Sequence, residues 1–409
     1  MRKKDSPVLL EQIPVGTAWS GHKVNFALLT TPPRQYAGYY NAERQLVIAT
    51  RTLPSPNWEY RKLDTAVGWD SHNTIQLFCD STGCLHIAAN MHASPLLYFQ
   101  MKRPHDLASI EQVGSLIGNC EERCTYPRFL TGPAGEMIFH YRYGASGCGN
   151  EIYNVYDART GRWSRLLDQP LTSGNGRMNA YFFGPVAGPD GFYHLAWVWR
   201  DNGDCATNHD LCYARSRDLR HWENAAGTPL SLPMTSDSPG IVVLPTAPRG
   251  SGLINMCGSI GFDSGKRPIL SFHLYDRDGA SRIFTLRLNQ NGPHQLVPHG
   301  NWPKAERWEF SGGGSIRQMV FAPPVRFQPD GTLLQDFEFV GRESGCWLLD
   351  PVTLKTRETL PPRTTCPAGL QTMEQTFPGL IRNWLPDAGC SGEPGVSWFL
   401  RWETLPANR

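Results

Sequence analysis

Short stretches of alternating apolar and polar residues recur along the chain, bounded by Gly, Pro, Asp and Asn. Clear examples are residues 46–50 (LVIAT), 84–89 (CLHIAA), 136–141 (EMIFHY), 192–197 (FYHLAW) and 268–272 (PILSF). Alternation with a period of two residues predicts strands with one buried face. A helix-like apolar spacing stands out in one short segment, residues 105–117. The pattern therefore predicts an all-β protein.

The predicted strands follow a repeating order: a turn with Gly or Asp-Gly, an alternating strand, and then a second strand. Such turns occur at residues 80–83, 132–135, 188–191, 263–265 and 329–331. Their spacing of roughly 50 to 70 residues suits one four-stranded blade with its loops. We therefore predict that residues 1–409 form a single β-propeller domain of six or seven blades, each with four antiparallel strands. A pair of immunoglobulin-like sandwiches is the alternative architecture.

The charge balance excludes some classes of partner. Lys and Arg number 39 against 37 Asp and Glu, a net charge of +2, and no basic block stands out. We expect no nucleic-acid partner, and the lack of a long apolar run in the sequence predicts no membrane span. An acidic ligand would have to be bound by a few local Arg and His residues.

The cysteines and the N-terminal residues bear on the compartment. An odd number of cysteines, 11, argues against a disulfide framework and fits a reducing compartment. Residues 1–12 carry basic residues without the apolar run of a signal peptide. We therefore expect a cytoplasmic, monomeric protein. A secreted or periplasmic location stays open, because a leader could have been removed from a precursor.

Two histidines are predicted to share one edge of a sheet. His72 precedes the predicted strand 74–78, and His92 follows the next strand, 84–89. The start of one strand of a hairpin and the end of the next lie at the same edge, so the two imidazoles should converge. A single His in a sheet is usually structural. Two at one edge, each beside an Asn, favour a functional role about as strongly as a structural one.

Tyr126 and Arg142 are predicted to converge in the same way, because Tyr126 opens one strand and Arg142 closes the following one. The structural alternatives are a core ring for Tyr126 and a salt bridge for Arg142. Together with the two histidines, these residues supply what β-elimination from a uronic acid requires. They offer a base for the C5 proton, an acid for the leaving oxygen at C4, and positive charge for the carboxylate. The same groups could also simply bind an acidic sugar.

Ordered motifs carry a family resemblance over roughly residues 15 to 310. The motifs are AWSGH (18–22), WDSHN (69–73), NMH (90–92), TYP (125–127) and ATNHD (206–210). With them the chain resembles the BNR-repeat propeller enzymes, which include ulvan lyases and enzymes that release rhamnose from glucuronic acid in arabinogalactan. It resembles the L-rhamnose-α-1,4-D-glucuronate lyases most closely. The resemblance implies a seven-bladed propeller that acts on an acidic oligosaccharide or polysaccharide, releasing rhamnose and an unsaturated uronate.

The resemblance also implies roles for the four residues. His92 would be a general base or acid, and His72 its partner near the carboxylate. Arg142 would neutralise the carboxylate, and Tyr126 would act as acid or base. Three other functions are weighed: an α-L-rhamnosidase that hydrolyses the linkage through His22, an ulvan-type endolyase, and a non-catalytic glycan-binding propeller. Hydrolysis normally uses two carboxylates at a defined separation, and the sequence shows no such pair beside His22.

Further residues are assigned to sugar binding. Asn73 lies beside His72, and Trp199 with Arg200 ends a strand of a third blade, where they suit stacking on a sugar and pairing with its carboxylate. The alternative is a packed Trp199 ring with a surface Arg200. His209 begins the next strand and is expected to line the central channel.

The elimination requires no metal or other cofactor. Cys205, His209 and Cys212, with Cys148, could together ligate zinc, but their spacing matches no recognised zinc motif. A structural calcium ion bound by carbonyl groups near the channel stays open.

Overall fold

The computed structural model describes residues 7–363, 367 and 370–406. Regular structure in these residues is almost entirely β-strand, and their helices are single 3-10 turns such as η1 (Leu107–Ser109) and η2 (Cys205–Thr207). The all-β prediction is confirmed. Among the same residues, no helix has the length and hydrophobicity that a membrane span needs. Residues 1–6, on which the expectation about a leader partly rests, lie outside the described part.

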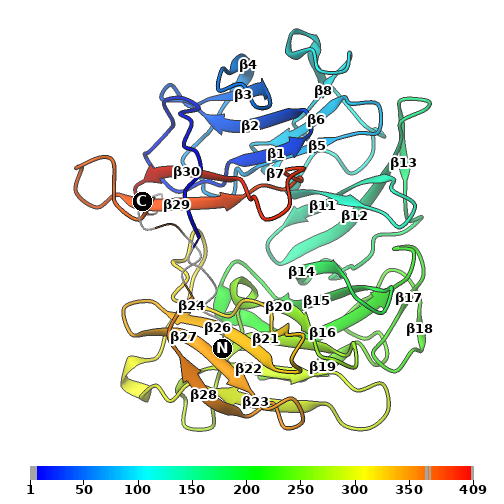
Figure 1. The fold of residues 1–409 in the computed structure, drawn as a ribbon. Helices are drawn as coiled ribbons and strands as arrows, with labels where there is room; N and C mark the ends of the chain where they lie inside the picture. Colours follow the sequence, from blue (N-terminus) through cyan, green and yellow to red (C-terminus); the bar gives the residue numbers. More distant parts are fainter. Residues whose placement is uncertain (1–6, 364–366, 368–369, 407–409) are drawn as a thin grey trace. The chain divides into compact units, whose positions relative to one another are not determined.

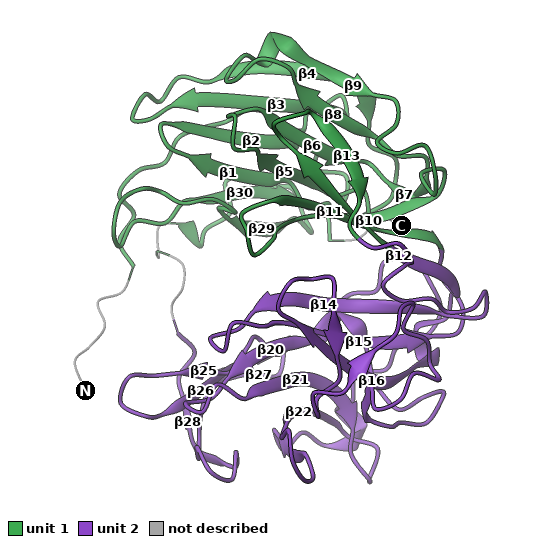
Figure 2. Ribbon diagram, turned by 90° about the vertical axis from the view of Figure 1, so that its right-hand side faces the viewer, with its two compact units in different colours: residues 1–144, 152–166, 364–409 green, residues 145–151, 167–363 purple. Residues whose placement is uncertain are grey.

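The chain forms two compact units (Figure 2). Unit 1 contains residues 1–144, 152–166 and 364–409, and unit 2 contains residues 145–151 and 167–363. The single-domain assignment and the number of blades stay predictions. Each unit is built from antiparallel sheets, and most of their strands are labelled in Figure 1.

Unit 1 begins with two four-stranded sheets. The first runs β1 (Ala27–Thr31), β2 (Arg34–Tyr40), β3 (Gln45–Thr52), β4 (Glu59–Ala66). The second runs β5 (Ile75–Cys79), β6 (Leu85–Ala89), β8 (Tyr98–Met101), β9 (Ile110–Val113). A third sheet has the order β13 (Arg162–Arg165), β12 (Cys148–Asp157), β11 (Met137–Ala145), β10 (Cys124–Thr131), β7 (His92–Ser94).

A hairpin late in the chain packs against the first strands of unit 1. The hairpin of β29 (Ile381–Pro386) and β30 (Phe399–Thr404) lies against the first sheet. The backbone N–H of Ala388 donates to the carbonyl of Leu28 at 2.9 Å, and the Asp387 carboxylate accepts from the backbone N–H of Thr30 at 2.8 Å. The rings of Phe26 and Trp402 stack with centroids 4.8 Å apart. These contacts hold the C-terminal hairpin to the N-terminal strands.

Unit 2 contains three further sheets. One has β14 (Asn179–Ala187), β15 (Tyr193–Arg200), β16 (Asn208–Ser216), β17 (Trp222–Glu223), β18 (Pro229–Leu230) and β19 (Val242–Leu244). The next has β20 (Ser259–Phe262), β21 (Pro268–Tyr275), β22 (Ser281–Arg287) and β23 (Gln295–His299). The last has β24 (Val320–Phe321), β25 (Arg326–Phe327), β26 (Leu333–Phe339), β27 (Glu343–Leu349) and β28 (Thr356–Leu360).

Three of the glycine turns that mark the repeat share one geometry. Gly83, Gly135 and Gly191 stand directly before or near the start of a strand, with φ of +84°, +83° and +82°. Glycine adopts this left-handed conformation without the steric cost that a Cβ atom brings. In the first of these turns, the Asp80 carboxylate also accepts from the backbone N–H groups of Thr82 and Cys84. The turns predicted from the sequence are therefore present.

Candidate active site

The β5–β6 hairpin brings His72 and His92 together, as the sequence predicted. Its register pairs Ile75 with Ala89, so the residues before β5 and after β6 lie at one edge of the sheet. The two imidazole rings are stacked, with centroids 4.1 Å apart and an interplanar angle of 23°. The side chains are 20% exposed for His72 and 34% for His92. Both rings are thus held by the protein and still accessible to a ligand.

The carboxylate of Asp70 bridges the two rings. Its Oδ1 accepts a hydrogen bond from Nδ1 of His72 at 2.5 Å, and its Oδ2 accepts one from Nδ1 of His92. Burial alone would raise the pKa of Asp70, but the hydrogen bonds from the two histidines outweigh burial and hold the pKa well below its usual range. Asp70 is therefore ionised and fixes the orientation of both rings.

The charge of Asp70 also decides where the histidines carry their protons. An ionised carboxylate accepts hydrogen bonds and has no proton to donate, so each Nδ1 that it contacts is an N–H. A neutral imidazole has one N–H group, which leaves the lone pair on Nε2. In its neutral form, either ring can therefore accept a proton at Nε2.

Sequence reasoning gave Asp70 no role. The signal was present in the Asp70-Ser71-His72 spacing, because an Asp side chain often accepts a hydrogen bond from the backbone two residues further on. That bond exists here, from the backbone N–H of His72 to Oδ1 at 2.9 Å. It turns the chain so that the same carboxylate reaches the ring of His72.

A β-bulge places Tyr126 beside His72. In the pairing of β10 with β11, Thr125 faces Arg142 and Arg128 faces His140, so the register shifts at Tyr126. Tyr126 has a φ of +55°, in the left-handed region, which costs a non-glycine residue about 1–3 kcal/mol. Its ring centroid lies 5.8 Å from that of His72. Bulges that redirect a side chain are frequent next to active sites.

Strand β7 connects Tyr126 with His92. It pairs with β10 so that His92 faces Thr125, the neighbour of Tyr126. The Thr125 hydroxyl accepts from the backbone N–H of Ala93 at 2.7 Å. Ala93 itself has a φ of +51°, so the chain bends directly after His92. The predicted convergence of the two histidines with Tyr126 is thus built by three strands.

Arg142 is the fourth residue of the predicted group, but it is buried and cannot contact a sugar carboxylate in the expected way. Its guanidinium carbon lies 4.9 Å from the ring centroid of Tyr126, so the four side chains do converge. The residue is 1% exposed, however. The expectation of an open guanidinium that clamps a carboxylate is not met, because the cation lies behind the tyrosine ring. A buried cation still exerts its field through the low-dielectric protein interior.

An exposed indole stands next to Asp70 in the chain. Trp69 is 58% exposed, while its ring contacts Trp19 edge-on at 5.2 Å and lies 5.6 Å from the ring of His22. His22 is fully buried and accepts a hydrogen bond at Nδ1 from the Trp19 indole, 3.1 Å long. Burial lowers the pKa of His22, and the nearby Asp70 offsets part of this effect. His22 thus lies beneath Trp69 and is not open to a sugar.

The residues assigned to sugar binding are buried, and Arg200 and His209 also have structural partners. Trp199 is fully buried, so its ring offers no face to a sugar and that expectation is not met. Arg200 donates to the backbone carbonyls of Asn202 and Gly203, so its side chain holds the loop that follows β15. Asn73 is also buried, with 7% exposure.

His209 is bound between two carboxylates. Its Nε2 lies 3.0 Å from Asp201 and its Nδ1 lies 3.0 Å from Asp210. Two acidic neighbours would repel an acidic sugar. We therefore see no support for His209 as a substrate-binding residue, and its place in a central channel stays a prediction.

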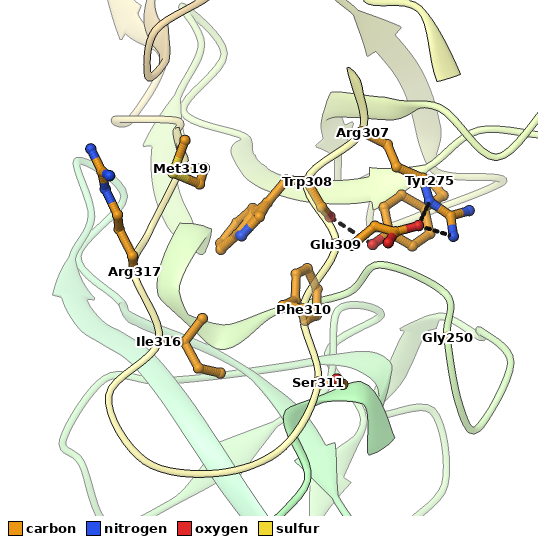
Figure 3. A pocket seen from close by; sticks show the side chains of 10 residues that line it. All are labelled: Gly250, Tyr275, Arg307, Trp308, Glu309, Phe310, Ser311, Ile316, Arg317 and Met319. Carbon is orange, nitrogen blue, oxygen red and sulfur yellow. Dashed lines mark hydrogen bonds and ion pairs between the residues drawn. The ribbon is translucent and has the colours of Figure 1, made fainter. Parts of the chain in front are cut away.

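Two other candidate sites carry none of the predicted chemistry. Unit 2 has a hollow of about 690 Å³ lined by Gly250, Tyr275, Arg307, Trp308, Glu309, Phe310, Ser311, Ile316, Arg317 and Met319 (Figure 3). Within it Arg307 is paired with Glu309 at 2.5 Å, and none of the predicted site residues lines it. For the zinc alternative, Cys205 and Cys212 are fully buried, and in the described part of the chain they form no ligand group with His209.

Comparisons with known proteins bear on the family and the fold of the chain. The sequence model of one protein family, described as BNR repeat-containing family member, matches residues 34–302. The short isoform of ulvan lyase from Alteromonas sp. (strain LOR) is 24% identical over 169 residues, which cover 36% of this chain and 31% of that protein. The long isoform from the same source is 26% identical over 121 residues, covering 27% of this chain and 12% of that protein. The chain thus spans less than a third of the length of these relatives.

Solved structures extend the likeness to nearly the whole chain. The polysaccharide lyase Uly1 superposes with a TM-score of 0.60 at 14% identity, covering 96% of this chain and 93% of that one. A PL25 ulvan lyase bound to -[GlcA(1-4)Rha3S]- superposes with a TM-score of 0.56 at 14% identity, covering 84% and 85%. At such identities the likeness is one of fold.

Proposed function

The chain belongs to the BNR repeat-containing family, and from this premise we propose that it is a polysaccharide lyase acting at a uronic acid by β-elimination. The observation that carries the proposal is the stacked pair of His72 and His92 on the single carboxylate of Asp70, with Tyr126 beside them. This arrangement offers a positioned base and a positioned acid within one accessible group. We further propose that the bond cleaved joins rhamnose to C4 of glucuronate.

In this reaction the protein must remove a proton, stabilise negative charge and protonate a leaving oxygen. The proton at C5 of a uronate is weakly acidic, and its removal places negative charge on the carboxylate side of the sugar. The C4–O bond then breaks and a C4–C5 double bond forms, while the leaving oxygen needs a proton. The products are a free sugar hydroxyl and an unsaturated uronate, and no water is consumed.

His92 is the base in this proposal. It is the more exposed of the two rings, and Asp70 holds its proton on Nδ1, which leaves Nε2 to take the C5 proton. His72 is stacked against it and oriented by the same carboxylate.

Tyr126 is the acid and Arg142 supplies the positive charge. The strained bulge presents the phenol beside His72, where its hydroxyl protonates the leaving oxygen. The guanidinium of Arg142 behind the ring favours the transient negative charge on Tyr126 and on the uronate. Transfer of the proton from His92 back to Tyr126 then restores the starting state.

The choice of substrate has separate support. An ulvan lyase matches part of this chain in sequence, and a PL25 ulvan lyase with a similar fold has a structure bound to -[GlcA(1-4)Rha3S]-. In this chain the exposed face of Trp69 offers a stacking surface of the kind that binds sugar rings, directly beside Asp70. We propose that Trp69 binds the neutral sugar next to the uronate.

The test is incubation of the protein with a set of uronate glycans, namely gum arabic, arabinogalactan and ulvan, followed by ultraviolet absorbance and analysis of the sugars released. The proposal predicts an absorbing unsaturated uronate and free rhamnose from the rhamnosyl-glucuronate glycans. Rhamnose released without the absorbing product would contradict the elimination. Cleavage of ulvan alone would retain the lyase and contradict the proposed linkage.

A further inference from the structure

Three side chains in the site have the chemistry of metal ligands. Asp70, His72 and His92 each offer one ligand atom, and these atoms all lie within 4.8 Å of one another. Their side chains are 30%, 20% and 34% exposed, so an ion can reach them from solvent. Within residues 7–363, 367 and 370–406, no second group of three or more His, Cys, Asp or Glu residues has this arrangement.

The donor set selects a class of ion. Two imidazole nitrogens with one carboxylate oxygen suit Zn²⁺, Co²⁺, Ni²⁺ or Cu²⁺, whereas Ca²⁺ and Mg²⁺ need more oxygen ligands. The ligands are also held in place before an ion arrives. The Asp70 carboxylate is fixed by the backbone of His72, and the chain on either side of His92 is fixed in left-handed conformations at Asn90 and Ala93, with φ of +56° and +51°. Ligands ordered in advance lose less entropy on binding.

We propose that a divalent transition ion such as Zn²⁺ binds to Asp70, His72 and His92 and reversibly blocks the site. The metal-binding part stands on the ligand geometry, and the blocking part rests on the proposed lyase function. The ion takes the place of the two Nδ1 protons that now contact the carboxylate.

Block of the site follows from the proton count of a neutral imidazole. Such a ring carries one proton, and a nitrogen bound to a metal carries none. Binding of the ion at Nδ1 therefore moves the proton of each ring to Nε2, with no net release of protons from neutral histidines. Nε2 then is an N–H donor with no lone pair, and it cannot take the C5 proton. The bound ion therefore converts both rings from proton acceptors into hydrogen-bond donors at Nε2.

The binding test uses Co²⁺, whose visible absorption reports its coordination, titrated into the full-length protein in metal-free buffer. We expect saturable binding of one ion, without a sulfur-to-cobalt charge-transfer band. Because loss of even an outer-shell partner can cost about 10–100-fold in metal affinity, we expect Asp70→Ala and His92→Ala to weaken binding by about 100-fold or more. Ca²⁺ in large excess should not displace Co²⁺.

Two control variants keep this test specific. His221→Ala removes an exposed histidine that contacts Asp218 at 2.7 Å, a pair with no third ligand, and should leave Co²⁺ binding unchanged. Cys148→Ser combined with Cys390→Ser removes two exposed thiols and should also leave it unchanged. Wild-type affinity in Asp70→Ala and His92→Ala, or loss of binding in the cysteine variant, would overturn the metal site.

The blocking part is tested with the uronate glycan that the protein cleaves. We expect Zn²⁺ to abolish elimination at the concentration that saturates the site, and a chelator to restore it. Activation by Zn²⁺, or unchanged activity with the site saturated, would overturn the block. If no uronate glycan is cleaved, the proposed function fails, while the Co²⁺ titration still decides whether the metal site exists.

Discussion

The imidazole rings of His72 and His92 lie face to face, 4.1 Å apart, on the two oxygens of one carboxylate. Through this shared carboxylate, the hydrogen bonding of one ring depends on that of the other. A change at either ring or at Asp70 alters the hydrogen bonding of both, so the effects of single substitutions in this group will not add.

Asp70→Asn will abolish most of the activity while the fold persists. The amide can donate a hydrogen bond to one Nδ1, which moves the proton of that ring to Nε2 and removes the base. We expect kcat to fall by about 100-fold or more, because loss of general-base catalysis costs 10²–10⁴-fold, with KM little changed. Steady-state kinetics on the cleaved glycan measure this. Asp218→Asn, which removes the carboxylate partner of exposed His221, is the matched control and should retain full activity.

Tyr126→Phe distinguishes the role of the Tyr126 hydroxyl as an acid from the role of its ring in packing. The ring over Arg142 remains, and only the hydroxyl is lost. We expect kcat to fall by about 10²–10⁴-fold, with a free energy of unfolding within about 0.5 kcal/mol of wild type. Tyr60→Phe, at an exposed tyrosine that donates to the carbonyl of Val15, should change neither quantity. A Tyr126→Phe enzyme with wild-type kcat would assign the acid to another group.

His22→Asn distinguishes elimination from hydrolysis through His22. The Asn side-chain oxygen can still accept the hydrogen bond from the Trp19 indole. Because His22 is a buried support beneath Trp69, we expect a loss of stability of about 1–3 kcal/mol. We expect kcat to fall by less than about tenfold, well short of the 10²–10⁴-fold cost of losing a catalytic group. Inactivation of a variant that circular dichroism shows to be folded would favour the hydrolase.

The hairpin geometry explains how much of the site the sequence could predict. Strand order and turn positions fix which residues share a sheet edge, so His72, His92, Tyr126 and Arg142 could be grouped without coordinates. The bridging role of Asp70 could not, because it depends on the path of the connection between β4 and β5, residues 67–74. The burial of Arg142 behind Tyr126 also could not be predicted, because a bulge sets it.

Packing between neighbouring elements explains the wrong expectations. Trp199 ends a strand, where a sequence pattern cannot tell an exposed ring from a buried one, and neighbouring chain covers it completely. The helix-like spacing of residues 105–117 yields the turn η1 and strand β9 instead. His105 has a φ of +62°, so no helix can include it, and pairing of β9 with β8 outweighs the weak local propensity of the residues that follow.

The stability of the chain will decrease on acidification, in part through His273. Burial lowers the pKa of His273 to about 4, against about 6.5 in an unfolded chain. The unfolded state therefore binds more protons below pH 6.5, so this contribution to stability is present above pH 6.5 and is lost as the pH falls through 4. The full difference is worth about 3 kcal/mol.

His273→Gln tests this contribution. In the wild type, the His273 ring contacts the Gly252 carbonyl at 2.6 Å and the Ser281 hydroxyl at 2.8 Å, and Gln stays neutral at every pH. Urea unfolding at several pH values between 7 and 4 should show a smaller loss of stability in the variant than in the wild type. His221→Gln, at a side chain that is 90% exposed, should follow the wild-type curve. Parallel curves for His273→Gln and wild type would contradict the assignment.

The most direct test of the account is to run the cleavage in water enriched in heavy oxygen and to weigh the products by mass spectrometry. Elimination at the His72–His92 pair predicts a uronate product lighter than its hydrolytic counterpart by one water molecule, because its C4 oxygen departs with the rhamnose and no oxygen from water is added to the uronate. His92→Ala should form neither fragment. A uronate product of hydrolytic mass, or full activity in His92→Ala, would contradict the account.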